Sequence, residues 1–101
     1  MEIGQVIGTV VSTRKHERLV GSKIQIVQPL DPHRMTPAGD PYVAVDAVGA
    51  GVGEQVLIAR GSAARKAMDN ESAPVDATIV GIIDEVDISE VDISAVRASR
   101  N

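Results

Sequence analysis

The chain lacks several residue types, and each absence excludes a class of structure or chemistry. Its 101 residues include no cysteine, phenylalanine or tryptophan, and Tyr42 is the only aromatic residue. Without cysteine the chain can form neither disulfides nor thiolate metal sites. No apolar run approaches the roughly 20 residues that span a membrane, and the N-terminus does not resemble a signal peptide. We therefore expect a soluble, cytoplasmic protein that does not contact a membrane.

What the sequence has in excess is β-branched aliphatic side chains. Valine and isoleucine number 15 and 10, against 3 leucines, and this bias favours strands over helices. A chain of this length forms one domain, with a modest core. A modest core gives a single subunit limited stability, and burial of surface between subunits would add to it. The composition therefore favours an oligomer. The formal net charge of −4 argues against a nucleic-acid binder.

Five segments have the alternation and the flanking turn residues of short strands. They are residues 3–13, 23–29, 42–48, 55–60 and 77–86. We expect the first two to pair antiparallel across a charged connection at 14–21, and an exposed proline-rich loop over 29–41. Ser62 is a candidate N-cap for a short helix over 63–68. This order predicts a mainly β fold, a small five-stranded OB-like β-barrel with one short helix. A two-sheet sandwich is the alternative.

The most glycine-dense stretch follows the third predicted strand. Gly49, Gly51 and Gly53 lie close together, at a spacing near the G-x-G-x-x-G fingerprint of dinucleotide sites. The third glycine comes one residue early and Glu54 takes the required position. A strand follows, so no helix N-terminus is available to bind a phosphate. We interpret the stretch as a structural turn between two strands.

The other candidate chemistry lacks the required spacing. Ser62 follows Gly61, but the G-x-S-x-G pattern of a nucleophile elbow is missing. His16 and His33 share no metal-ligand spacing, and surface histidines are the simpler interpretation. Nucleic-acid-binding barrels need aromatic platforms along a basic groove, which one tyrosine and a short basic cluster at 14–18 do not supply. We predict no catalytic site, no cofactor, no metal site and no nucleic-acid partner.

The C-terminal segment differs in composition from the rest. Residues 86–95 repeat a pentapeptide as VDISE and VDISA, and five carboxylates lie between Asp84 and Asp92. The spacing and the glycine of a calcium loop are absent, so an acidic edge that discourages sheet-to-sheet aggregation is the simpler interpretation. The first repeat unit could continue the fifth strand or pair along an edge. We divide the chain into a β-barrel domain at 1–86 and an acidic, polar tail at 87–101.

Four motifs resemble one protein family. They are GTVVSTRK (Gly8–Lys15), KIQIVQP (Lys23–Pro29), VAVDAVGAGVGEQVLIARGSAAR (Val43–Arg65) and PVDATIVGIID (Pro74–Asp84), in the expected order. In them the chain resembles the pentameric vertex proteins of bacterial microcompartment shells, the EutN/CcmL family. The resemblance implies an OB-like barrel assembled as a cyclic homopentamer with a structural, non-catalytic role. It also implies hexameric shell proteins and encapsulated enzymes as partners, in a shell in the cytoplasm.

Small residues allow close approach where five copies meet, so they are our candidates for the pentamer axis or the subunit interface. These candidates are Gly49, Ala50, Gly51, Gly61 and Ser62, followed by Arg65, which could reach a carboxylate or carbonyl of a neighbour.

Two other functions remain open from the sequence. The first is an OB-fold binding module for single-stranded nucleic acid or oligosaccharide, which the missing aromatic platform disfavours. The second is a small enzyme or ligand-binding barrel, which would need convergent polar groups in a dry cavity. The sequence does not name the enclosed pathway.

Overall fold

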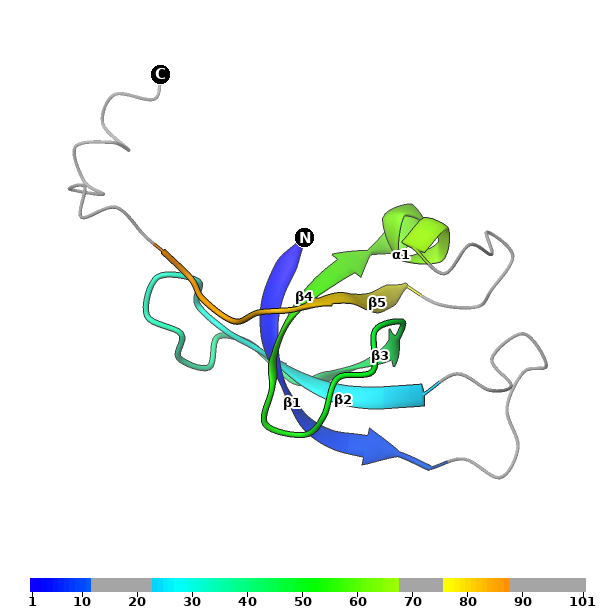
Figure 1. Ribbon diagram of the computed structural model, residues 1–101, viewed down its shortest axis with the longest axis horizontal. Helices are drawn as coiled ribbons and strands as arrows, with labels where there is room; N and C mark the ends of the chain where they lie inside the picture. The colour runs from blue at the N-terminus through cyan, green and yellow to red at the C-terminus, as the bar shows by residue number, and fades with distance from the viewer. Residues whose placement is uncertain (12–22, 68–75, 88–101) are drawn as a thin grey trace, which may run out of the picture.

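Five strands close into a barrel with one helix against it. The computed structural model describes residues 1–11, 23–67 and 76–87. The elements are β1 (Glu2–Val10), β2 (Lys23–Pro29), β3 (Tyr42–Asp46), β4 (Gln55–Arg60), α1 (Gly61–Ala67) and β5 (Ala77–Ile82). Around the barrel the strands follow the order β1-β2-β3-β5-β4 (Figure 1). Among the five strands of the described residues, only β3 and β5 pair in parallel. The predicted mainly β, OB-like barrel is confirmed, and the sandwich alternative is wrong.

The strands agree with the sequence-based bounds in part. β2 and β4 have the predicted bounds, and β1 and β2 pair antiparallel as expected. β3 ends early, at Asp46, because the Asp46 carboxylate accepts hydrogen bonds from the next turn. β5 ends at Ile82, so the first repeat unit does not begin as its continuation. The predicted connection at 14–21 and the tail beyond Asp87 lie outside the described residues.

The predicted N-cap is wrong, because α1 begins before Ser62. Gly61 starts the helix with a positive φ of 61°, a conformation that glycine adopts without strain. Its N–H donates to the Asp76 carbonyl at 2.8 Å. This glycine turns the chain directly from β4 into α1, which places Ser62 inside the first helical turn.

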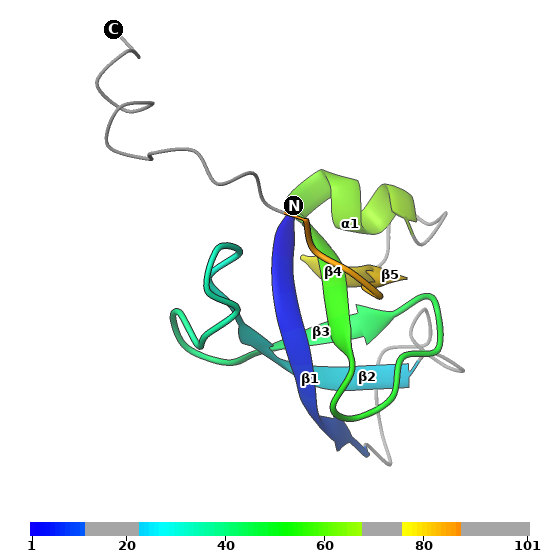
Figure 2. The same ribbon diagram turned by 60° about the vertical axis from the view of Figure 1, so that its left-hand side comes forward.

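The barrel interior is filled by small aliphatic side chains. The buried cluster consists of Val6, Val27, Ala44, Ala50, Val56, Ile58, Ala77 and Ile79, with Tyr42 packed against it. Helix α1 covers the outer side of β4 and β5 (Figure 2). There Ala64 and Thr78 are fully buried, and the Thr78 hydroxyl donates to the Ala64 carbonyl at 2.9 Å. The helix therefore supplies a second layer of core on that side only.

The proline-rich connection between β2 and β3 is mostly exposed, as predicted, whereas Leu30 at its start is buried. Leu30 is 7% exposed, pairs with Pro37 in an isolated bridge and donates its N–H to the Ile3 carbonyl at 2.9 Å. The start of the loop is thereby fixed to β1.

Candidate functional site

A buried glutamine organises the polar side of the barrel interior. Gln25 on β2 is fully buried. Its Oε1 accepts a hydrogen bond from the Thr9 hydroxyl at 2.7 Å, and its Nε2 donates to the Ala50 carbonyl at 2.7 Å and to Asp46 Oδ2 at 3.3 Å. A bulge between Val6 and Gly8 shifts the register of β1, and this change of phase places Thr9 opposite Gln25. The network connects three strands to the glycine-rich loop.

The glycine-rich loop spans residues 47–54. Its first half is held by the end of β3 and by β2. Asp46 Oδ1 accepts the N–H groups of Val48 and Gly49, both at 2.9 Å. Lys23 Nζ donates to the Ala50 carbonyl at 3.0 Å, and the Ala50 side chain is fully buried in the core. The loop is thus anchored on the inside of the barrel.

The second half of the loop is held by Glu54 and by β1. The Gly51 N–H donates to Glu54 Oε1 at 2.7 Å, and the Glu54 N–H donates to the Gly51 carbonyl at 3.1 Å. The Gly53 N–H donates to the Val6 carbonyl at 2.7 Å. The predicted structural turn is confirmed. The Glu54 carboxylate already accepts the Gly51 N–H, and its negative charge would repel an anion such as phosphate there.

The anchored loop presents two apolar side chains outward. Val48 is 42% exposed and Val52 is 63% exposed, although the backbone between them is fixed by the bonds above. An ordered loop with exposed valines can bind a surface at low entropic cost, so it is suited to a protein contact.

The interface candidates lie in two places within one chain. Gly49, Ala50 and Gly51 precede β4, whereas Gly61, Ser62 and Arg65 follow it in α1. The two groups therefore lie at opposite ends of β4 (Figure 1). Ala50 has its side chain in its own core, so only its backbone is available to a neighbour.

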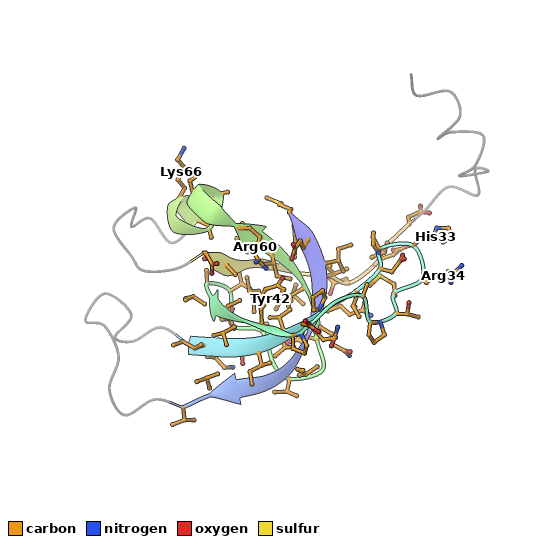
Figure 3. All side chains as sticks on the ribbon, turned by 180° about the vertical axis from the view of Figure 1, so that it is seen from behind. His33, Arg34, Tyr42, Arg60 and Lys66 are labelled. Carbon is orange, nitrogen blue, oxygen red and sulfur yellow. The ribbon has the colours of Figure 1, made fainter. Side chains whose placement is uncertain are left out.

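A cluster that the sequence did not reveal joins three strands through Tyr42. The Tyr42 hydroxyl donates to Glu2 Oε2 at 2.7 Å. The Arg60 guanidinium lies 4.3 Å from the Tyr42 ring centroid and 3.5 Å from the same Glu2 oxygen. Figure 3 shows Tyr42 and Arg60 together, far from His33 and Arg34. The three residues come from distant parts of the sequence, so no local pattern could indicate their contact.

The environment of Tyr42 changes its acidity. Burial, followed by the hydrogen bond to the Glu2 carboxylate, raises the pKa of Tyr42 to about 12. Because the folded chain holds this proton more tightly than the unfolded chain, the interaction contributes fully below pH 10. The contribution is lost as the pH rises from 10 towards 12.

Spectrophotometric titration tests this directly, because Tyr42 is the only tyrosine and tryptophan is absent. We expect a single phenolate transition near pH 12 in the folded protein, and a lower midpoint in Glu2→Gln. Gln5→Glu, which alters β1 without reaching Tyr42, is the control. A wild-type midpoint at the ordinary value of about 10 would contradict the geometry of the cluster.

The His, Asp and Glu side chains of the described residues are dispersed over the barrel. None of their His, Asp and Glu side chains form a group of three or more that could hold a metal ion. His33 is exposed and its backbone N–H donates to Asp31 Oδ1 at 2.8 Å, whereas His16 lies outside the described part. Over the same residues, no buried side-chain nitrogen or oxygen lacks a hydrogen-bond partner. No helix found there has the length and apolar character that crossing a bilayer requires.

Fold and site together define a class: a small OB-type barrel whose polar groups stabilise its own loops and whose exposed features suit protein contacts. The chain belongs to the EutN/CcmL family, because the family described as ethanolamine utilisation protein EutN/carboxysome matches residues 1–84. That match ends close to the predicted domain boundary at 86, which stays a prediction.

Known relatives agree with this assignment. The chain is 51% identical over 89 residues to the carboxysome shell vertex protein CcmL of Synechocystis, covering 88% of each chain. It is similar in structure to the GrpN pentameric microcompartment shell protein of Rhodospirillum rubrum, with a TM-score of 0.79 and 45% identity over 88% of this chain and 100% of that one. A solved ethanolamine utilization protein, EutN, gives a TM-score of 0.83 at 42% identity, over 87% and 91% of the two chains.

Proposed function

We propose that this chain is a structural shell protein whose homopentamers cap the vertices of a bacterial microcompartment in the cytoplasm. The observation that carries the proposal is its likeness to the pentameric GrpN shell protein over almost the whole barrel. The alternative of a nucleic-acid or oligosaccharide module loses its basis. The relatives are shell proteins, and the single aromatic ring, Tyr42, is covered by Arg60 instead of being free to stack.

The proposed mechanism is geometric. Identical head-to-tail contacts close into a ring when the rotation per subunit divides a full turn. A ring of five fits where a layer of hexagonal tiles must curve, so a pentamer closes a vertex that hexamers leave open. The implied partners are hexameric shell proteins around the ring and enzymes inside the shell, and the role is structural instead of catalytic.

We assign the glycine-rich loop to the axis or the subunit contact of the ring. Gly49 and Gly51 carry no side chain, and the loop that holds them is fixed by Asp46, Lys23 and Glu54. A fixed loop of small residues allows several copies to approach closely. Gly61, Ser62 and Arg65, at the start and in the middle of α1, are the second part of the assignment.

Gly51→Trp is expected to dissociate the ring and to leave the barrel folded. A Cβ on Gly51 would meet only the flexible Glu54 carboxylate, at 3.3 Å, so the subunit can adapt whereas a crowded contact cannot. Sedimentation velocity should show a folded monomer. Arg65→Glu should act likewise through α1. Glu54→Gln, which retains an acceptor for the Gly51 N–H and adds no bulk, is the control and should stay pentameric. If Gly51→Trp or Arg65→Glu sediments as the wild-type ring, the assignment of that residue is wrong.

Shell assembly tests the function itself. Hexameric shell proteins assembled with this chain should give closed polyhedral particles in electron micrographs, and the same proteins without it should give open or elongated ones. Equal closure in both preparations would refute the vertex role.

A further inference from the structure

Part of the outer surface of β1, β2 and β3 is apolar, beside the outward-facing pair Gln5 and Gln28, although an exposed barrel face normally carries polar side chains. β2 turns Gln25 and Val27 inward, and Ile24 and Ile26 outward. Ile26 lies opposite Val43 on β3 and Gly8 on β1, and Val43 is 54% exposed. We call this surface, formed by Gly8, Ile26 and Val43, face A. On β2 the outward set therefore includes two isoleucines, whereas the buried polar residue Gln25 lies inside beside Val27.

A second apolar surface lies on the other strands. Ile3 on β1 is opposite Leu57 on β4, and Leu57 is opposite Gly81 on β5. These three residues form face B. Beside them is a hollow of about 490 Å³ whose lining includes Met1, Ile3, Leu30, Pro32, Ala38 and Leu57. β1 pairs with β2 on one side and with β4 on the other, so it contributes to both faces.

Each face contains a glycine that its own barrel does not require. A Cβ on Gly8 would touch only the Ile26 side chain, at 3.5 Å, and a Cβ on Gly81 would lie 3.7 Å from Leu57 Cβ, both ordinary contact distances. Both glycines lie near bulges, but neither has the positive φ that would require glycine there. Glycine weakens a strand and often marks close approach of another chain. The unexplained glycines therefore indicate a neighbour.

We propose that face A of one copy packs against face B of the next copy, with Gly8 and Gly81 admitting the neighbour's backbone or side chains. This inference rests on the proposed pentamer. A ring needs two different, complementary patches on each subunit. This chain has two that are mostly aliphatic: face A, where Val43 is exposed, and face B, beside a hollow whose lining also includes Glu2. A second copy is the occupant because solved relatives that match this barrel are described as pentameric. The contact would bury the aliphatic side chains of face A, Ile26 and Val43, which the isolated subunit leaves partly exposed to water.

The test uses valine at each glycine, because valine suits a strand and adds bulk only to the outer face. Gly8→Val and Gly81→Val should each give folded monomers in native mass spectrometry, with cooperative thermal unfolding, at concentrations where the wild type is a ring. Asp40→Val adds the same side chain on the exposed proline-rich loop and should remain a ring. If either glycine variant keeps the wild-type ring and its resistance to dilution, the proposal is overturned.

Two milder variants decide the matter if a glycine variant fails to fold. Val43→Gln and Leu57→Gln change half-exposed or exposed side chains, and each should weaken the ring about tenfold or more, as substitutions at the centre of an interface do. Sensitivity at face A alone would indicate a contact between two copies of face A and would overturn the A-to-B pairing. A wild-type protein that forms no pentamer would instead refute the proposed function, so the two failures are distinguishable.

Discussion

Gly4→Val is expected to abolish the folded barrel or to leave it only marginally stable. A Cβ on Gly4 would overlap Val27 Cγ1, and it would lie 3.0 Å from the Gln28 carbonyl oxygen and 3.1 Å from Ile58 Cδ1. The Gln28 backbone cannot move away without breaking the pairing of β1 with β2. Overpacking a core costs about 1–3 kcal/mol and sometimes more, and a clash with backbone belongs at the upper end. That is a large part of the roughly 5–15 kcal/mol that stabilises a domain.

Urea unfolding at one fixed protein concentration measures this loss, because assembly makes apparent stability depend on concentration. Gly8→Val is the matched control, since it places the same side chain four residues along the same strand without a close contact inside the subunit. Its monomer should unfold at higher urea than Gly4→Val. Equal unfolding midpoints for Gly4→Val and the wild type would show that β1 and β2 do not approach as described.

Gln25→Leu is expected to destabilise the protein by about 1–3 kcal/mol, although leucine is similar in size and more apolar. The change removes bonds to the Thr9 hydroxyl, the Asp46 carboxylate and the Ala50 carbonyl. Partners left unsatisfied in a buried site each cost free energy. The loop that depends on Ala50 should also loosen, with faster amide exchange at Gly53.

The control for this variant is Gln28→Leu. Gln28 lies on the same strand but is only half-buried, and its Nε2 bonds are to the Pro29 and Gly39 carbonyls. Water can replace those bonds, so the loss should be smaller than for Gln25→Leu. If Gln25→Leu proved neutral or stabilising in urea unfolding, the polar network would not be what holds the loop.

The succession of strands along the chain could be predicted from the sequence, because β-branched alternation and turn residues are local signals. The bounds of β2 and β4 were predicted correctly for that reason. The family was predicted from the resemblance of four motifs. Alternation could not tell which face of β2 is inside. Ile24 and Ile26 are the more apolar set, yet the structure places Gln25 inside, because it bonds the loop that closes the barrel.

Contacts between distant residues could not be predicted. The cluster of Glu2, Tyr42 and Arg60 depends on strands that become neighbours only in the folded barrel. Ser62 resembled a helix cap, but the backbone freedom of Gly61 sets the start of α1 instead. The glycine-rich stretch was interpreted correctly as a turn. The spacing of its glycines differs from that of a dinucleotide-binding motif, and this difference is visible in the sequence alone.

The loop at 47–54 connects the polar network of the barrel to the proposed subunit contact. Gln25, Asp46, Lys23 and Glu54 fix its backbone, and the barrel then presents small residues and two valines at a defined position. We propose that this position is near the centre of a ring. Ile24 and Ile26 face outward on β2, where a neighbouring subunit of the proposed ring would cover them.

Native mass spectrometry of the unmodified protein measures the oligomeric state on which the proposed vertex role depends. A homopentamer should appear at about five times the 10.6 kDa mass of one chain, with no substantial dimer or hexamer, over the concentrations at which the protein is purified. A spectrum dominated by monomer or dimer under the same conditions would contradict the proposed vertex ring.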